Sequence, residues 1–186
     1  MREVRHIACL IFMLLSSCTR GKNEVIWRGE GGRSRVYLER VTDTLYTLNL
    51  TCHADDKHTI WRLPYPVYRF DHGDLWGDET PEIVVGVIKA TRFDSIVRKR
   101  LFIYRIADGT YIRPLWLGSR VSQPLEDFAV DRSCHPAHIR TIEKERSGAY
   151  LVAEYKWRGF GLRFVRYLAR EQALKDADDL LHKRDR

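Results

Sequence analysis

The sequence predicts a mainly β protein made of antiparallel four-stranded units in series, with a short helix at the C-terminal end. Three observations lead to this fold class. Apolar and polar side chains alternate with a period of two in many short segments, which indicates half-buried strands. Turn-forming Gly, Asp and Thr residues separate these segments. A convincing helical period is absent until the end of the chain, after residue 168.

The same patterns divide the chain into four parts. We predict a signal peptide over 1–17, a lipid-anchored tether over 18–23, a β domain over 24–168, and a helix with a charged tail over 169–186. Removal of the signal peptide leaves 169 of the 186 residues. That length suits one domain with a core of its own.

The N-terminal segment has the layout of a secretory signal peptide. Arg2 and Arg5 form a basic start, and residues 7–15 are an unbroken apolar run of nine residues. Such a run is too short to span a bilayer as a permanent helix. It matches the apolar part of a cleaved signal, in which small residues follow at the cut. A buried N-terminal helix is the alternative.

The stretch Leu15-Ser16-Ser17-Cys18 follows this run and resembles the bacterial lipobox. The resemblance implies that signal peptidase cuts before Cys18 and that lipid such as palmitate is attached to its sulfur. The mature chain would then be a membrane-anchored lipoprotein of the cell envelope. Thr19, which stands where an Asp would favour the inner membrane, indicates the outer membrane. An ordinary signal peptide with a chance Cys is the other interpretation.

The chain is basic before and after this processing. Its net charge of +7 falls to +6 once Arg2, Glu3 and Arg5 leave with the signal. A positive balance fits nucleic acid, an anionic envelope surface, or solubility alone. Because export separates the protein from nucleic acid, we expect no nucleic-acid partner.

The β domain opens with three predicted strands, 24–30, 34–41 and 45–52, which would be most of one unit. Two complete units follow, each with four strands in the same order. Their segments are 67–75, 81–89, 100–106 and 112–119, and then 125–132, 138–145, 149–157 and 162–169. Four-stranded units in series suggest propeller blades, with a β-sandwich or an open barrel as rivals.

Two features refine this assignment. The segment 81–89 is continuously apolar, so we expect a strand that is buried on both faces. After residue 168, Leu174, Ala177, Leu180 and Leu181 fall on one helical stripe, with charged residues elsewhere. That pattern predicts a terminal amphipathic helix.

The stretch GDLWGDETPEIVVG, residues 73–86, places four acids in a turn directly before the apolar strand. It resembles the FG-GAP (or VCBS) repeats of integrin-α-like β-propellers, whose acidic loop often binds calcium. The resemblance implies a calcium site formed by Asp74, Asp78 and Glu82 with the carbonyl of Thr80. Alternating oxygen ligands suit a hard cation that takes six to eight of them.

This loop departs from the family pattern at two positions. Trp76 stands where the third-position oxygen ligand is expected, and Glu79 stands where Gly is expected, although a left-handed backbone favours Gly. We therefore favour a structural acidic turn, in which Asp74 and Asp78 accept hydrogen bonds from the loop's own amides. The matching place in the next unit keeps only its leading acid, Asp131.

Two cysteines, Cys52 and Cys134, remain in the mature chain if Cys18 carries lipid. An exported protein permits a disulfide between them. A zinc site is an alternative, because each lies in a short motif with histidines. The residues of that set are Cys52, His53, His58, Cys134, His135 and His138. Two cysteines at strand ends, paired or simply buried, are the simplest interpretation.

Motifs for catalysis are missing from the sequence. The Gly-rich residues 29–33 precede a predicted strand rather than a helix, so they do not form a phosphate loop. No Ser stands in a nucleophile elbow. We therefore expect no enzymatic activity and no bound cofactor apart from the calcium considered above.

Binding is the class of function that remains. The aromatic and proline-rich segment 61–70 is of the kind that lines glycan or peptide sites, although strand aromatics also pack in cores. The basic run over 89–100 suits an anionic envelope polymer or a solvated hairpin. The sequence predicts a lipid-anchored, non-enzymatic envelope protein with an interaction or scaffold role. The alternatives are a glycan-binding accessory lipoprotein and a calcium-binding repeat protein.

Overall fold

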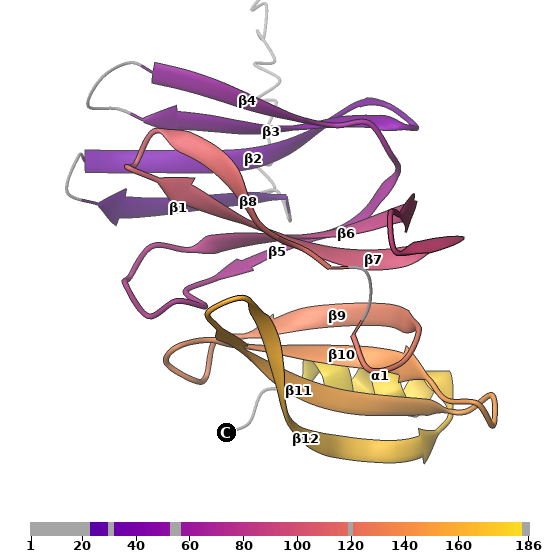
Figure 1. Ribbon diagram of the computed structural model, residues 1–186. Helices are drawn as coiled ribbons and strands as arrows, with labels where there is room; N and C mark the ends of the chain where they lie inside the picture. Colours follow the sequence, from indigo (N-terminus) through magenta and orange to yellow (C-terminus); the bar gives the residue numbers. More distant parts are fainter. Residues whose placement is uncertain (1–22, 30–31, 53–56, 119–120, 184–186) are drawn as a thin grey trace, which may run out of the picture.

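The computed structural model describes residues 23–29, 32–52, 57–118 and 121–183, which form three four-stranded antiparallel sheets and one helix (Figure 1). The predicted signal peptide, the lipobox with Cys18, and all of the tether except Asn23 lie outside the described residues.

Each sheet is a meander, in which neighbouring strands in the sequence pair with one another. Sheet 1 consists of β1 (Glu24–Gly29), β2 (Gly32–Thr42), β3 (Leu45–Cys52) and β4 (Lys57–Leu63). Sheet 2 consists of β5 (Val67–Gly73), β6 (Glu82–Thr91), β7 (Asp94–Ala107) and β8 (Tyr111–Leu117). Sheet 3 consists of β9 (Leu125–Asp131), β10 (His138–Lys144), β11 (Tyr150–Arg158) and β12 (Gly161–Gln172). The helix α1 (Leu174–His182) ends the described chain.

The predicted fold class is confirmed: the chain is mainly β, and its units resemble propeller blades. The sequence prediction left the first unit one strand short, and β4 is that strand. It pairs with β3 from Tyr46↔Leu63 to Cys52↔Lys57. Trp61 and Leu63 face the core, whereas Ile60 and Arg62 are exposed. The period of two is therefore present in β4, although the prolines that follow the strand make the segment resemble an aromatic binding segment.

Two apolar layers hold the sheets together. The first lies between sheets 1 and 2 and contains Leu48, Leu50, Phe102 and Tyr104. The second lies between sheets 2 and 3 and contains Leu101, Ile103 and Phe128 among others. Strand β7 therefore contributes alternate residues to both layers. Strand β6 is buried on both of its faces, as predicted, with Ile83–Val87 inaccessible or nearly so.

The helix covers the face of sheet 3 that points away from sheet 2. Its Ala177 and Leu181 pack on Ile142 and Val152. Ala177, Leu180 and Leu181 of the predicted stripe therefore face the sheet, whereas Leu174 is 43% exposed. The helix begins at Leu174 rather than at 169. Residues up to Gln172 pair with β11 instead, and this pairing satisfies their backbone groups. No helix among the described residues is long and apolar enough to cross a membrane.

The molecule has two distinct ends, which Figure 1 shows at the right and the left. The β2–β3, β6–β7 and β10–β11 turns lie at one end, which we call the hairpin end. The β1–β2, β5–β6 and β9–β10 connections lie at the other, which we call the loop end. Because β2 finishes at the hairpin end and β1 is antiparallel to it, the chain enters sheet 1 from the hairpin side.

Candidate functional site

The acidic stretch forms the β5–β6 connection at the loop end. Both carboxylate oxygens of Asp74 accept backbone hydrogen bonds: Oδ1 from the amides of Gly77 (2.6 Å) and Asp78 (3.1 Å), and Oδ2 from that of Glu79 (2.9 Å). Asp78 Oδ1 accepts from the amide of Thr80 at 3.1 Å. These are the bonds that the acidic-turn interpretation predicts. Asp74 and Asp78 thus fix the loop through local hydrogen bonds.

The position where the family pattern has Gly is left-handed in this chain. Glu79 has a φ of 65° and Gly77 has a φ of 87°. The loop therefore keeps the backbone path for which Gly is favoured, although Glu79 carries a Cβ that disfavours it. This strain is local and is offset by the hydrogen bond that the backbone amide of Glu79 donates to Asp74.

Glu82 lies beneath the loop at the start of β6 and is fully buried. Its Oε2 accepts hydrogen bonds from the amides of Leu75 at 2.9 Å and Trp76 at 3.1 Å. Burial removes the carboxylate from water and raises the pKa of Glu82 to about 7, even though these two bonds act in the opposite direction. The amides of the loop thus donate hydrogen bonds to an acid whose charge changes near neutral pH.

Arg105, on the neighbouring strand β7, supplies the positive charge that faces this loop. It forms an ion pair with Asp78, and its Nε lies 3.8 Å from Glu82 Oε1. Its guanidinium also lies 4.4 Å from the ring centroid of Trp76. Trp76 in turn packs against Trp157 of sheet 3, with centroids 6.0 Å apart. Trp76, which stands in the third ligand position, therefore contacts both Arg105 of sheet 2 and Trp157 of sheet 3.

Calcium should have little effect on folding, because Arg105 already pairs with Asp78 and lies near Glu82, and Trp76 supplies no oxygen ligand. We expect the melting temperature to be the same with millimolar calcium and with chelator, since only a ligand that binds the native state shifts it. Arg105→Gln should lower it by about 3 °C, which corresponds to roughly 1 kcal/mol for the ion pair and ring contact. Thermal unfolding of both chains is the measurement. A rise of many degrees with calcium in the unchanged chain would restore the metal interpretation.

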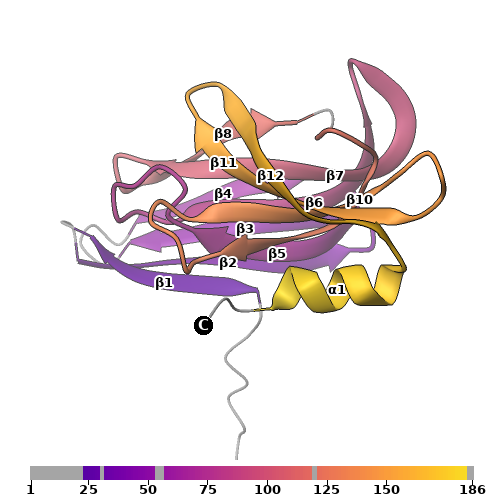
Figure 2. The same ribbon diagram turned by 90° about the horizontal axis from the view of Figure 1, so that it is seen from below.

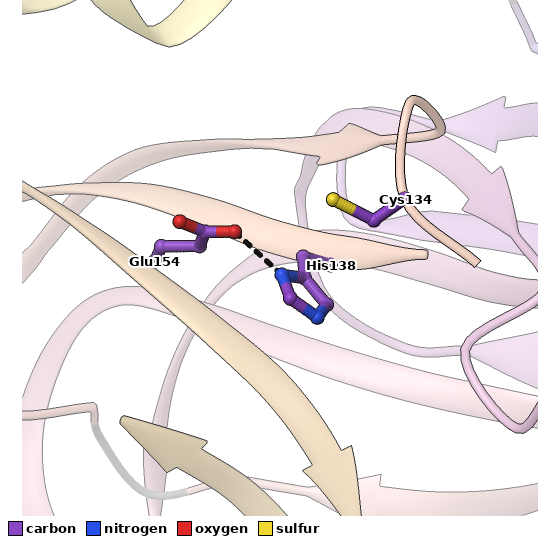
Figure 3. Close-up of side chains that lie close together, drawn as sticks. All are labelled: Cys134, His138 and Glu154. Atoms are coloured by element: carbon purple, nitrogen blue, oxygen red, sulfur yellow. Dashed lines mark hydrogen bonds and ion pairs between the residues drawn. The ribbon is translucent and has the colours of Figure 1, made fainter. Parts of the chain in front are cut away.

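A second group of side chains lies in sheet 3, where Cys134, His138 and Glu154 come together (Figure 3). One donor atom of each residue lies within 4.8 Å of those of the other two. His138 begins β10, Glu154 lies on β11, and Cys134 comes from the β9–β10 connection. Arg140 on β10 is directly opposite Glu154 on β11. His138, two residues before Arg140, is therefore the diagonal neighbour of Glu154.

Glu154 is the best-supported member of this group. The residue is 2% exposed. Its Oε1 lies 2.5 Å from His138 Nδ1, and its Oε2 accepts a 2.6 Å hydrogen bond from Arg166 Nε. Burial alone would raise the pKa of Glu154, but the bonds from His138 and Arg166 outweigh it and lower the pKa. Glu154 is therefore held as a carboxylate.

The arrangement does not match a thiol nucleophile with its base. In such a pair, one ring nitrogen meets the sulfur while the other is oriented by an acid. In Figure 3, Nδ1 of His138 faces Glu154, and Nε2 lies on the far side of the ring from Cys134. The sulfur, Nδ1 and the carboxylate oxygen instead lie within 4.8 Å of one another, which is close enough for all three to ligate one ion after small movements.

The structure does not bring together the two cysteines for which a disulfide was considered. Both are free thiols. The thiol of Cys52 donates a 2.6 Å hydrogen bond to the carbonyl of Gly109, which fastens sheet 1 to a turn of sheet 2. Cys134 lies instead beside His138.

The predicted zinc set is also divided. His58 is exposed on β4, and His53 lies outside the described residues. His135 is exposed too and lies 3.8 Å from Asp74. Among the members of the set that the structure describes, only Cys134 and His138 meet, and Glu154 completes the group. Sequence reasoning missed Glu154 because alternation along β11 placed it on the polar face.

An open cavity of about 320 Å³ lies at the loop end, where the three sheets converge. Sheet 1 contributes Val25 and Trp27 of β1, sheet 2 contributes His72 and Asp74, and the β9–β10 connection contributes His135 among others. The wall therefore combines an aromatic ring with acidic and imidazole groups. Such a mixture of apolar surface and a few polar groups is typical of binding sites.

The aromatic segment 61–70 has a different role from the binding site considered for it. Trp61 packs on Tyr104 with centroids 5.8 Å apart, Tyr65 packs on Phe102 at 5.8 Å, and Tyr68 packs on Phe128 at 6.3 Å. These side chains fill the layers between sheets, which is the core role that strand aromatics commonly have.

Comparison of the chain with protein-family models, with curated proteins and with solved structures gives no match.

Proposed function

We propose that this chain is a lipid-anchored, non-enzymatic protein of the bacterial cell envelope that rests on the membrane by its hairpin end and binds a protein partner at its loop end. One observation carries the proposal. The end from which the chain enters sheet 1 also bears a basic hairpin with exposed apolar side chains, whereas the binding cavity lies at the opposite end.

The β6–β7 hairpin projects from the body of the molecule (Figure 2). At its tip, Phe93 is 83% exposed, Val97 67% and Ile96 58%. Large apolar side chains gathered at one exposed place mark an interaction surface more often than chance. Three such residues on a projecting turn are suited to enter the interface of a bilayer.

Basic residues flank this tip. Arg92 is exposed beside the ring of Phe93, at 5.9 Å from its centroid. Arg98 and Lys89 follow on the two strands and are half-buried, and Arg98 lies 3.6 Å from Asp94. A Lys or Arg close to an anionic membrane surface contributes about 1 kcal/mol to binding. The apolar tip and its basic flanks therefore match a bilayer that contains anionic lipid.

Arg100 holds the hairpin in shape. It is 1% exposed, and its guanidinium donates to the carbonyl of Ile96 at 2.9 Å and pairs with Asp94 at 2.9 Å. Asp94 Oδ1 also accepts from the amide of Ile96 at 3.1 Å. The tip is thus ordered before it meets a membrane, so that little conformational entropy is lost on binding.

The lipid predicted on Cys18 supports the same orientation. Six residues, 18–23, separate that sulfur from β1, and an extended chain of this length reaches about 20 Å. A lipid on a flexible segment anchors a protein without fixing how its folded domain lies on the membrane. The basic apolar hairpin supplies a second contact that would fix this orientation.

Vesicle binding tests the hairpin without the lipid. A chain that starts at Thr19 retains every described strand and should sediment with vesicles of anionic lipid but not with vesicles of neutral lipid. The double variant Phe93→Ser/Ile96→Ser should bind at least about tenfold more weakly, because two apolar side chains no longer leave water. Phe160→Ser is the matched control, since Phe160 is fully exposed on the β11–β12 turn at the loop end.

Two outcomes would contradict this part of the proposal. One is equal sedimentation of the unchanged chain and the Phe93/Ile96 double variant. The other is an equal loss of binding in Phe160→Ser, which would show that any exposed aromatic residue has the same effect.

A glycan-binding accessory role is the second candidate. It is favoured by Trp27, which lines the same cavity as Asp74, because aromatic rings beside hydrogen-bonding groups suit sugars. A glycan array separates the two functions. A defined sugar that is lost in Trp27→Ala would favour the glycan, whereas capture of one envelope protein without any sugar signal would favour the protein partner.

A further inference from the structure

We propose that Cys134, His138 and Glu154 form a binding site for one divalent metal ion of the zinc class, such as Zn²⁺ or Co²⁺. This inference does not depend on the lipid anchor or on the partner. It rests on three donor atoms of different chemistry, a sulfur, an imidazole nitrogen and a carboxylate oxygen, all within 4.8 Å of one another. Zinc binds thiolate, imidazole and carboxylate ligands in proteins.

The geometry requires only small movements of these side chains. Ligand atoms stand about 2.0–2.3 Å from zinc, so neighbouring ligands of a tetrahedral site are about 3.5 Å apart. His138 Nδ1 and Glu154 Oε1 are closer than this, at 2.5 Å, and must separate slightly. Cys134 must approach, which its position on a connection rather than a strand allows.

The charges suit a cation in this position. Without an ion, a proton lies between Nδ1 of His138 and Oε1 of Glu154. When the ion binds, its positive charge takes the place of that proton. The neutral ring gives up its proton at Nδ1 and takes one up from water at Nε2, which frees the Nδ1 lone pair for the ion. The thiol of Cys134 releases its proton to solvent, so that one proton is lost overall.

The surroundings hold the ligands in place. Arg166 Nε donates to Glu154 Oε2 at 2.6 Å and leaves Oε1 directed at the site. Such a second partner on a ligating carboxylate orients it and tunes affinity. The connection that carries Cys134 is anchored by Ser133, whose amide and hydroxyl both donate to Asp131 Oδ1, at 3.0 and 2.7 Å.

Three protein ligands leave the fourth position of a tetrahedral ion for water or a ligand. Cys134 also lines the cavity at the loop end, so the ion would lie beside that cavity. An ion at this site would place a Lewis acid beside the cavity, whose lining already contains His72 and Asp74.

The site differs from the zinc set that the sequence suggests. In the sequence, the motif CHPAH offers Cys134, His135 and His138. In the structure, His135 is 71% exposed by its side chain and faces Asp74, and buried Glu154 takes its place. His135→Gln is therefore an exact control within the same motif.

Cobalt titration tests the site. The untagged chain from Thr19 should bind one equivalent of Co²⁺ with a near-ultraviolet thiolate-to-cobalt band and the strong visible bands of four-coordinate cobalt, and one equivalent of Zn²⁺ should remove both. Cys134→Ser should lose the thiolate band, and Glu154→Gln should weaken binding at least about tenfold. His135→Gln and Cys52→Ser should titrate like the unchanged chain. Circular dichroism of each variant establishes that it is folded.

The proposal fails if the unchanged chain shows no thiolate band, or if folded Cys134→Ser keeps it. It also fails if His135→Gln or Cys52→Ser abolishes the band, because the ligands would then be different residues. If Cys134→Ser does not fold, the titration of Glu154→Gln with Co²⁺ tests the proposal instead. A Co²⁺ affinity equal to that of the unchanged chain would then contradict it.

Discussion

Val84→Asp should abolish folding of the domain. Val84 lies on β6, is fully buried, and faces the apolar layer between sheets 2 and 3. An Asp there would be a charge without a partner, and it would lie opposite Asp71 on β5, so repulsion would add to desolvation. Burial of such a group costs several kcal/mol, which is comparable with the whole stability of a typical domain.

Val97→Asp is the matched control, because it makes the same chemical change at a side chain that is 67% exposed. A surface substitution of this kind should cost less than about 1 kcal/mol. Far-ultraviolet circular dichroism and chemical unfolding of both variants are the measurements. If Val84→Asp unfolds at the same denaturant concentration as Val97→Asp, β6 is not buried between two sheets.

Glu82 should make the stability depend on pH by about 3 kcal/mol. Its pKa is raised from 4.5 to about 7 in the folded chain, mainly by burial. The folded state therefore holds the proton more tightly than the unfolded state. The stabilisation by this proton is complete below about pH 4.5 and is lost as the pH rises through 7.

Glu82→Gln isolates this effect from the other acids, since Gln stays neutral at every pH. The difference in unfolding free energy between the variant and the unchanged chain should shift by about 3 kcal/mol in favour of the variant between pH 4 and pH 8.5. Urea unfolding in chelator at several pH values measures it. A difference that stays constant across this range would show that Glu82 is ionised in the fold without cost.

The sequence patterns predicted the sheets well, because strand burial leaves a direct periodic signal. The continuous apolar run of β6 has the burial that was predicted, whereas β7, which alternation predicts to be half-buried, is buried on both faces from Arg100 to Tyr104. Strand β4 was missed, although Trp61 and Leu63 alternate with exposed residues in the same way. Its core-facing residues are aromatic or lie close to Pro64 and Pro66, a composition that also fits a binding segment.

The sites were harder to predict because they depend on register and on cover by distant elements. Arg105 comes 23 residues after Glu82, and only the pairing of Ile83 with Tyr104 brings the two side by side. Glu154 lies on the polar face of β11, as alternation indicates, yet it is buried because His138 and Arg166 close around it. No local pattern in the sequence contains either relation.

A depth measurement on the lipidated chain tests most directly whether the hairpin end rests on the bilayer. A fluorophore is attached at Ile96→Cys or at Phe160→Cys in a Cys134→Ser background, where Cys52 is buried, and the chain is placed in vesicles whose acyl chains carry bromine. We expect strong quenching at 96 and none at 160, and in Cys18→Ala we expect loss of the lipid, with the remaining membrane recovery confined to vesicles that contain anionic lipid. Quenching at 160 alone, or equal quenching at the two positions, would contradict the orientation.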